Sequence, residues 1–238
     1  MDEYKVNGIV LSSSDYKEKD ILITLFTAEL GKIKAVLRGA KQSKAKLKFA
    51  GQPFCFAEWI LIKKGEYFYV TNVNLFDTFY ELTTDYDSFL IASSMSEICL
   101  EVLKPNMINE KLFLEFLNAL KCLVYDKFDN KLVFSKFILN LFSCSGYGLN
   151  FTACGMCNTP IMGDIVLSSN THEFCCVSCS NNFGLPVSKR EYNTLKILFN
   201  ATWSNLNTVK ASDELLVSLI GLLKYNLQNI LNHKFHSF

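Results

Sequence analysis

Residues 154–179 read CGMCNTPIMGDIVLSSNTHEFCCVSC. They hold two C-x2-C pairs, Cys154 with Cys157 and Cys176 with Cys179, separated by eighteen residues. Two thiolates that lie two residues apart can face one ion from a tight turn, and two such turns complete a tetrahedral shell of four sulfurs. Four cysteines leave no position for water or substrate. The spacing therefore predicts one structural zinc ion rather than a catalytic one.

The residues around the two pairs refine this prediction. Asn158 follows the first pair, where such a turn often needs a residue that tolerates positive φ. Cys175 lacks the two-residue spacing to Cys179, so we expect it to be a bystander. We expect His172 to be a surface or neighbouring group rather than a ligand. Buried free thiols or a redox pair are the alternatives to a metal site.

Ahead of this segment the chain reads first as strands and then as helices. Five segments rich in Val, Ile, Phe and Tyr predict a small β-barrel: residues 5–11, 21–26, 32–37, 54–62 and 67–75. Neither face of residues 54–62 is plainly polar, so this strand should be covered on both sides.

Apolar residues at helical spacing then predict five helices: residues 85–103, 109–124, 130–143, a helix from Ser188, and 212–231. The first should end before Pro105, which cannot continue a helix. Asn109 is a candidate N-cap, and Ser188 with Glu191 has the spacing of a capping box.

The composition indicates a folded protein of the cytosol. Half of the 238 residues are apolar, enough for a sizeable core. Charged residues interrupt the first thirty positions, so we expect no signal peptide and no membrane span. In a reducing compartment, paired cysteines are better explained as metal ligands than as disulfides. Four of the nine cysteines lie in apolar runs and are expected in the core: Cys55, Cys99, Cys122 and Cys144.

The positive charge of the chain is concentrated in one window. The formal net charge is only +1, yet no acidic residue lies between Glu29 and Glu58. Seven cations fall there and are our candidates for DNA contact: Lys32, Lys34, Arg38, Lys41, Lys44, Lys46 and Lys48. A partner touching this window responds to the local charge rather than to the chain average. A solvated lysine-rich surface is the alternative.

Other side chains bear on function less directly. Trp59, Tyr67 and Tyr69 can stack on bases or pack against the helical part, and packing is the favoured expectation. Phosphate-binding loops, dinucleotide-binding fingerprints, H-E-x-x-H and G-x-S-x-G are all missing from the sequence. The three histidines are His172, His233 and His236, so the sequence predicts a protein that is not an enzyme.

The order of these parts resembles the RecO family. The resemblance rests on Gly8–Leu11, Tyr16–Asp20, Arg38–Lys41, Gln52–Phe54, and Gly146 with Tyr147 leading into Cys154 and Cys157. It spans nearly the whole chain. Asn158 stands where a glycine is usual in the family.

The resemblance implies an α+β protein. Its N-terminal OB-fold barrel would span residues 1–79, and a helical domain would span residues 80–238, with a four-cysteine zinc-binding insertion at about residues 150–186. It further implies a cytoplasmic, nucleoid-associated mediator of DNA repair and recombination. Such a protein binds single- and double-stranded DNA, anneals complementary strands, contacts the C-terminal tail of single-strand binding protein, and works with RecR to load RecA. The alternatives are a zinc-dependent enzyme on a nucleotide substrate and a zinc-stapled protein interaction module.

Overall fold

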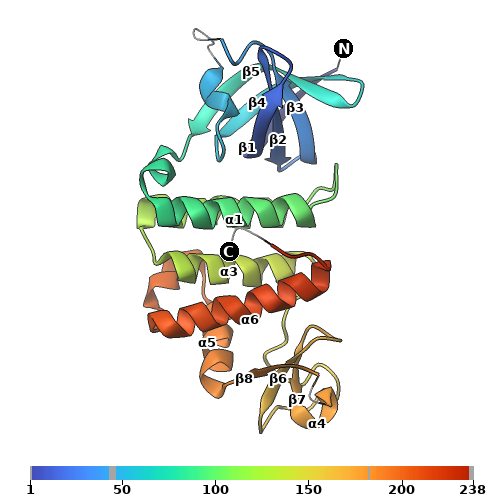
Figure 1. Cartoon of the computed structure of the whole chain (residues 1–238), viewed down its shortest axis with the longest axis vertical. Helices are drawn as coiled ribbons and strands as arrows, with labels where there is room; N and C mark the ends of the chain where they lie inside the picture. Colours follow the sequence, from blue (N-terminus) through green and yellow to red (C-terminus); the bar gives the residue numbers. More distant parts are fainter. Residues whose placement is uncertain (1, 43–46, 182, 236–238) are drawn as a thin grey trace. The chain divides into compact units, whose positions relative to one another are not determined.

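Five strands close a barrel in the N-terminal part of the chain (Figure 1). In the computed structural model, which describes residues 2–42, 47–181 and 183–235, the strand order is β1-β2-β3-β5-β4. The pair β3 and β5 is parallel, and the other neighbouring pairs are antiparallel. The bounds are β1 Glu3–Tyr16, β2 Asp20–Thr27, β3 Gly31–Leu37, β4 Phe56–Lys64 and β5 Tyr67–Asp77. The five predicted strands are confirmed, and β1 continues beyond its predicted end at residue 11.

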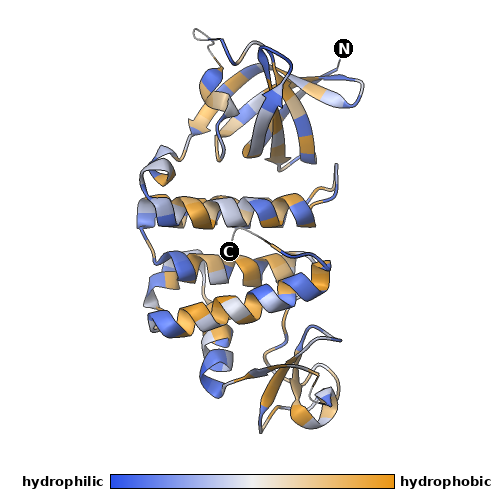
Figure 2. Ribbon diagram, in the orientation of Figure 1, coloured by the Kyte–Doolittle hydropathy of each residue, from blue (hydrophilic) through white to orange (hydrophobic). Residues whose placement is uncertain are grey.

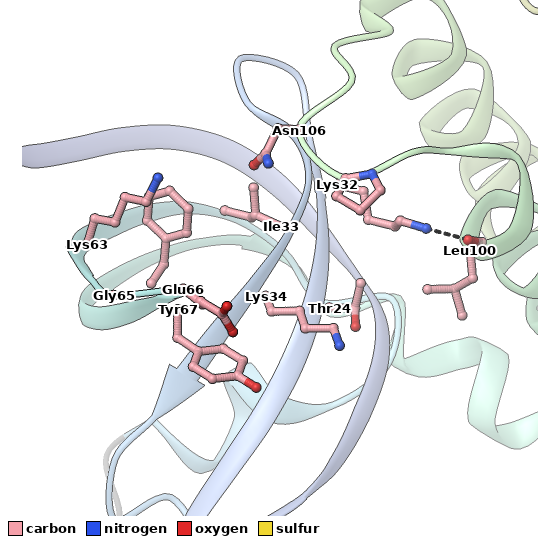
Figure 3. A pocket seen from close by; sticks show the side chains of 12 residues that line it. Thr24, Lys32, Ile33, Lys34, Lys63, Gly65, Glu66, Tyr67, Leu100 and Asn106 are labelled. Atoms are coloured by element: carbon pink, nitrogen blue, oxygen red, sulfur yellow. Dashed lines mark hydrogen bonds between the residues drawn. The ribbon is translucent and has the colours of Figure 1, made fainter.

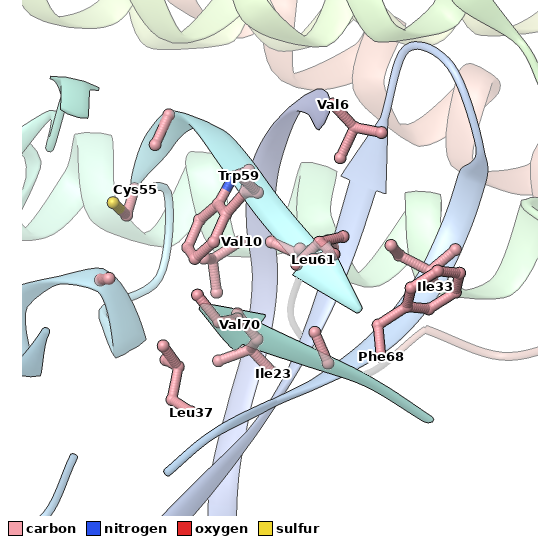
Figure 4. Close-up of a cluster of buried hydrophobic side chains, with 14 of the residues drawn as sticks. Val6, Val10, Ile23, Ile33, Leu37, Cys55, Trp59, Leu61, Phe68 and Val70 are labelled. Carbon is pink, nitrogen blue, oxygen red and sulfur yellow. The ribbon is translucent and has the colours of Figure 1, made fainter. Parts of the chain in front are cut away.

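The barrel interior is filled by every second residue of the strands, as the pleat of a β-strand requires. The side chains drawn and labelled in Figure 4 come from all five strands and from the segment before β4: Val6, Val10, Ile23, Ile33, Leu37, Cys55, Trp59, Leu61, Phe68 and Val70. The same alternation appears along the strands in Figure 2, where hydrophilic and hydrophobic residues follow one another. The interior is therefore a packed core rather than a channel.

Two helices belong to the same compact unit as the barrel, which ends at Leu120. They are α1 (Tyr86–Val102) and α2 (Glu110–Lys121). Their N-terminal amides are capped by the side chains of Asp85 and Asn109, as predicted for Asn109. Short 3-10 helices lie at η1 (Lys48–Gly51) and η2 (Tyr80–Thr84).

These helices cover part of the outer barrel surface with aromatic contacts. The rings of Phe26 and Phe113 lie 5.4 Å apart at their centroids, and those of Phe56 and Phe113 lie 6.2 Å apart. The outer face of β4 is thus covered where it carries Phe56, as the apolar pattern of this strand predicted.

The second compact unit begins at Lys121 and is built around α3 (Asn130–Cys144). Ten residues of this helix are buried, because α5 (Lys189–Asn200) and α6 (Asp213–Leu231) both pack against it. A π-helical turn, η3 (Cys122–Asp126), precedes α3, and a 3-10 helix, η4 (Trp203–Thr208), precedes α6. The predicted helices are therefore confirmed. The domain boundary expected between residues 79 and 80 stays a prediction.

Between α3 and α5 lies a small module that holds the cysteine pairs. Its strands are β6 (Ile165–Ser168), β7 (Phe174–Cys176) and β8 (Gly184–Val187), in the order β7-β6-β8, with the short helix α4 (Val177–Ser180) after β7. We did not predict this sheet from the sequence, because three- and four-residue strands are too short to give a period.

Candidate metal centre and nucleic-acid interface

The four paired cysteines lie together in the module. Their sulfur atoms all lie within 4.8 Å of one another. The Sγ atom of Cys176 lies 3.8 Å from that of Cys154 and 3.9 Å from that of Cys157. Four sulfurs placed about 2.3 Å from a central zinc ion form a tetrahedron with edges of about 3.8 Å. The cluster therefore has the dimensions of a tetrahedral thiolate shell.

Backbone geometry brings each pair into position. Asn158 has φ +56°, and its N–H donates to the carbonyl oxygen of Cys154 across 2.9 Å, which closes the first turn. Asn181 takes the same left-handed conformation, with φ +47°, two residues after Cys179. Asparagine tolerates this region better than most residues. The positive φ predicted for Asn158 is confirmed.

The electrostatics of the cluster favour a bound cation. Burial disfavours the thiolate of Cys154, but N–H groups of Cys157, Cys176 and Met156 donate to its sulfur and lower its pKa to about 6. By contrast, hydrogen bonds with Cys176 and Cys157 raise the pKa of Cys179 to about 12. The thiol of Cys179 therefore loses its proton less readily than a free cysteine, and a cation bound among the four sulfurs would favour its thiolate form. The donor set fits a thiophilic metal ion such as zinc.

Cys175 and His172 lie outside this group of four sulfurs. Cys175 is buried, and its sulfur lies 3.6 Å from the hydroxyl of Thr171. His172 has a left-handed backbone in the turn between β6 and β7, and its carbonyl oxygen accepts a hydrogen bond from Asn226 of α6. This turn therefore attaches the module to the helices of the same unit.

The predicted DNA contacts fall into three groups. Lys34, Arg38 and Lys48 have exposed side chains. Lys32 and Lys41 are half-buried and make specific bonds within the protein. The remaining two, Lys44 and Lys46, lie outside the described residues.

Lys41 is held by the end of β1 and the loop that follows it. Its ammonium nitrogen lies 3.0 Å from a carboxylate oxygen of Asp15 and donates to the carbonyl oxygen of Lys17 across 3.2 Å. Its charge is therefore partly neutralised. The side chains of Lys34, Arg38 and Lys48 are exposed, and their contact with DNA stays a prediction.

Aromatic rings support further cations on the same barrel. The guanidinium group of Arg38 lies 4.5 Å from the ring centroid of Tyr69, and the ammonium group of Lys64 lies 5.9 Å from it. Lys17 lies over Tyr16 and Lys63 over Phe68 in the same way. Such contacts favour a cation over a ring face by electrostatic attraction. These three lysines lie outside the basic window between Glu29 and Glu58, and Lys63 and Lys64 come close to β3 only because β4 and β3 both pair with β5.

Trp59 corrects one expectation. Its side chain is completely buried in the barrel interior, and its indole N–H donates to the carbonyl oxygen of Gly8 across 2.9 Å. It neither packs against the helical part nor reaches a base, so both interpretations of this residue were wrong. Tyr67 and Tyr69 are half-buried on the outer face.

Two family models match the chain, "Recombination protein O N terminal" over residues 1–79 and "Recombination protein O C terminal" over residues 83–237. The chain belongs to the RecO family. The DNA repair protein RecO of Clostridium novyi (strain NT) is 30% identical over 89% of this chain and 83% of its own length. The RecO protein of Clostridium perfringens (strain 13 / Type A) is 27% identical over 95% and 92%, and that of Acetivibrio thermocellus is 27% identical over 92% and 88%.

RecO membership supports a role in DNA repair and recombination, and the resemblance seen in the sequence is confirmed. RecO is not known as a family of enzymes. Within the described residues, the helices are all too short or too polar to cross a membrane.

Proposed function

We propose that this RecO protein binds single- and double-stranded DNA through the cations on the outer barrel surface and anneals complementary strands. The observation that carries the proposal is the grouping of exposed cations around β3 and β5: Lys34, Arg38, Lys63 and Lys64. Lys34 lies on β3 and Arg38 directly after it, whereas Lys63 and Lys64 end β4. β5 pairs with both β3 and β4, so the two groups of cations flank the same strand.

The mechanism needs no covalent step. Ammonium and guanidinium groups neutralise phosphates and release counterions, and this attraction is independent of sequence. Two strands that are both partly neutralised repel each other less, so complementary segments can meet more often. Binding should therefore weaken steeply as salt rises.

The partners proposed for this chain come from the family resemblance. With RecR, it would help to load RecA onto single-stranded DNA coated by single-strand binding protein, whose C-terminal tail it would contact. This role places the protein in the cytoplasm, at the nucleoid. Purified RecR and single-strand binding protein, each titrated against this chain, would test these contacts directly.

The metal proposed for the cysteine cluster is one structural zinc ion held by Cys154, Cys157, Cys176 and Cys179. The sulfur spacing supports this assignment, because it matches the edge of a zinc–thiolate tetrahedron. A shell filled by four thiolates would stabilise the module, and no step of DNA binding is assigned to the ion.

Charge reversal tests the proposal. Lys34→Glu with Arg38→Glu should weaken binding of a labelled single-stranded oligonucleotide and make its salt dependence shallower, by about 0.7 in log–log slope for each lost contact. The matched control is Lys189→Glu with Arg190→Glu, an exposed lysine–arginine pair in the second unit. Equal binding by both double variants at low salt would contradict the proposal.

The alternative functions give different results in the same titration. An enzyme acting on a nucleotide, or a protein interaction module, would bind the oligonucleotide without a steep salt slope or not at all. The enzyme alternative also requires an open metal position. It would gain support if substitution of His172 or Cys175 abolished an activity.

A further inference from the structure

A pocket of about 700 Å³ opens beside the seam between β3 and β5 (Figure 3). Among the described residues these strands pair through two positions, Ala35 with Phe68 and Val36 with Tyr69. Towards the start of β3 the pairing stops, and the pocket lies there. It is lined by residues of β2, of β3, of the β4–β5 hairpin, and of α1 with the loop that follows it, all within the first compact unit.

The walls of the pocket combine apolar surface with positive charge. Ile33 and Phe68 also belong to the barrel core and contribute apolar surface. Lys34 and Lys63 are exposed cations among the lining residues, and Glu66 is the one acidic residue among them. Apolar and aromatic surface suits a base, and ammonium groups suit the adjoining phosphates.

The loop that forms the opposite wall is fixed in place. The backbone N–H of Asn106 donates to the carbonyl oxygen of Lys32 across 3.0 Å. Pro105 and Lys32 also pair as an isolated parallel β-bridge. These contacts hold the backbone of Asn106 at the pocket, and its side chain is among those that line it (Figure 3). An amide offers both a donor and an acceptor, the groups that base edges recognise.

We propose that this pocket takes one unpaired nucleotide of a bound single strand, an inference that rests on the proposed DNA-binding function. The base would lie against the half-buried ring of Tyr67, with Asn106 at its edge and Lys34 and Lys63 near the phosphates. In a duplex the bases are paired and stacked, so none can enter without being flipped out at an energetic cost. The outer cations attract both forms of DNA, and the pocket adds affinity for the single strand.

Filling the pocket is the direct test. Thr24 lines it from β2 and is half-buried, so Thr24→Trp places a large ring in the space. This change should weaken binding of an oligothymidylate about tenfold, the loss expected for one stacked base. Binding of a duplex of equal length should change by less than about twofold, since its phosphate contacts remain. The matched control is Thr71→Trp, an exposed threonine of β5 outside the pocket, which should leave both affinities unchanged.

Two outcomes would overturn the inference. One is an equal fall in affinity for single strand and duplex, and the other is no change in either. If charge reversal at Lys34 and Arg38 still weakened binding of both the single strand and the duplex, the proposed function would stand. Only the assignment of the pocket to a nucleotide would then be wrong. A wild-type chain that ignored all DNA at low salt would instead overturn the proposed function.

A second measurement on the wild-type chain covers the case in which Thr24→Trp fails to fold, as judged by circular dichroism. A single-stranded oligonucleotide made entirely of abasic units keeps every phosphate and lacks every base. It should bind at least about tenfold more weakly than oligothymidylate, since stacking is lost. Equal affinity for the two would contradict a base-binding pocket.

Discussion

The ammonium group of Lys32 donates a hydrogen bond to the carbonyl oxygen of Leu100 across 2.5 Å (Figure 3). Leu100 lies in the last turn of α1, so this bond ties β3 of the barrel to the helix that follows it. Burial lowers the pKa of Lys32 below its ordinary value, because the charged amine loses water, although Glu101 opposes this effect. Lys32 therefore has a structural task that Lys34, two residues further on, does not share.

Substituting these two lysines should separate stability from DNA binding. Lys32→Met leaves a carbonyl without its charged donor, so the free energy of unfolding should fall by about 1–3 kcal/mol. Lys34→Met should leave stability nearly unchanged and make the salt dependence of single-strand binding shallower by about 0.7. Urea denaturation and a salt titration measure the two effects. A larger change of salt slope for Lys32→Met than for Lys34→Met would contradict this assignment.

Local signals in the sequence were enough to predict the helices. Asn109 caps α2, and Ser188 with Glu191 forms the predicted capping box at the start of α5. The two C-x2-C pairs were equally readable, because the ligand spacing is set within each turn. Such features depend on residues three or four positions apart, so a single sequence carries them.

Long-range pairing limited the rest of the prediction. The basic window treated Lys32 and Lys34 alike, and only the contact with Leu100, 68 residues away, distinguishes them. The sequence favours packing of Trp59 against the helical part, because two apolar faces of β4 do not show which one turns inward, and barrel closure places this side chain in the core. The pocket beside the β3–β5 seam also depends on closure, since its walls come from four separate segments.

Gly31 should be sensitive to a single added methyl group. Its φ is +67°, and a Cβ atom there would lie 2.1 Å from the carbonyl oxygen of Met107. Gly31→Ala should therefore lower the free energy of unfolding by more than about 2 kcal/mol, combining a left-handed backbone with a backbone clash. Gly39→Ala is the matched control. Its φ is +65°, but the nearest atom would be the Gln42 amide nitrogen at 3.7 Å, so only the conformational cost of about 1 kcal/mol applies. Similar losses in chemical denaturation would contradict the clash.

Glu191 should make the stability of the second unit depend on pH. Burial alone would raise its pKa, but hydrogen bonds from the side chain of Ser188, from Ser218 and from the Ser188 backbone outweigh burial and lower it below 4.5. A carboxylate with a lowered folded-state pKa adds stability above the unfolded value, and that contribution is lost as pH falls through the folded value.

Glu191→Gln keeps an acceptor for the capping box and removes the charge. At pH 7 the variant should be less stable than the wild type by about 0.5–1 kcal/mol, as for a weakened cap. The difference should shrink as the pH falls below 4.5 and through the lower folded-state pKa, because the unfolded chain binds its proton first and the folded carboxylate binds it last. Glu214→Gln, an exposed acid in the first turn of α6, is the control. A difference that stayed constant from pH 7 to pH 3 would rule out the charged form of Glu191 as the cause.

Metal content should depend on Cys157 and be independent of Cys175. Cys157→Ser removes one of the four clustered sulfurs, whereas Cys175→Ser changes a buried thiol outside the group. Elemental analysis should find about one zinc ion per chain in the wild type and in Cys175→Ser, and clearly less in Cys157→Ser. Acidification should release the ion, because thiolates must bind protons as they leave the metal.

Chelation of the ion should lower the thermal midpoint of the second unit. Single-strand affinity at low salt should change by less than about twofold, since the proposed cations all precede Gly65 and belong to the first unit. A zinc-depleted chain that stayed folded but lost DNA binding would mean that the metal module takes part in the interface.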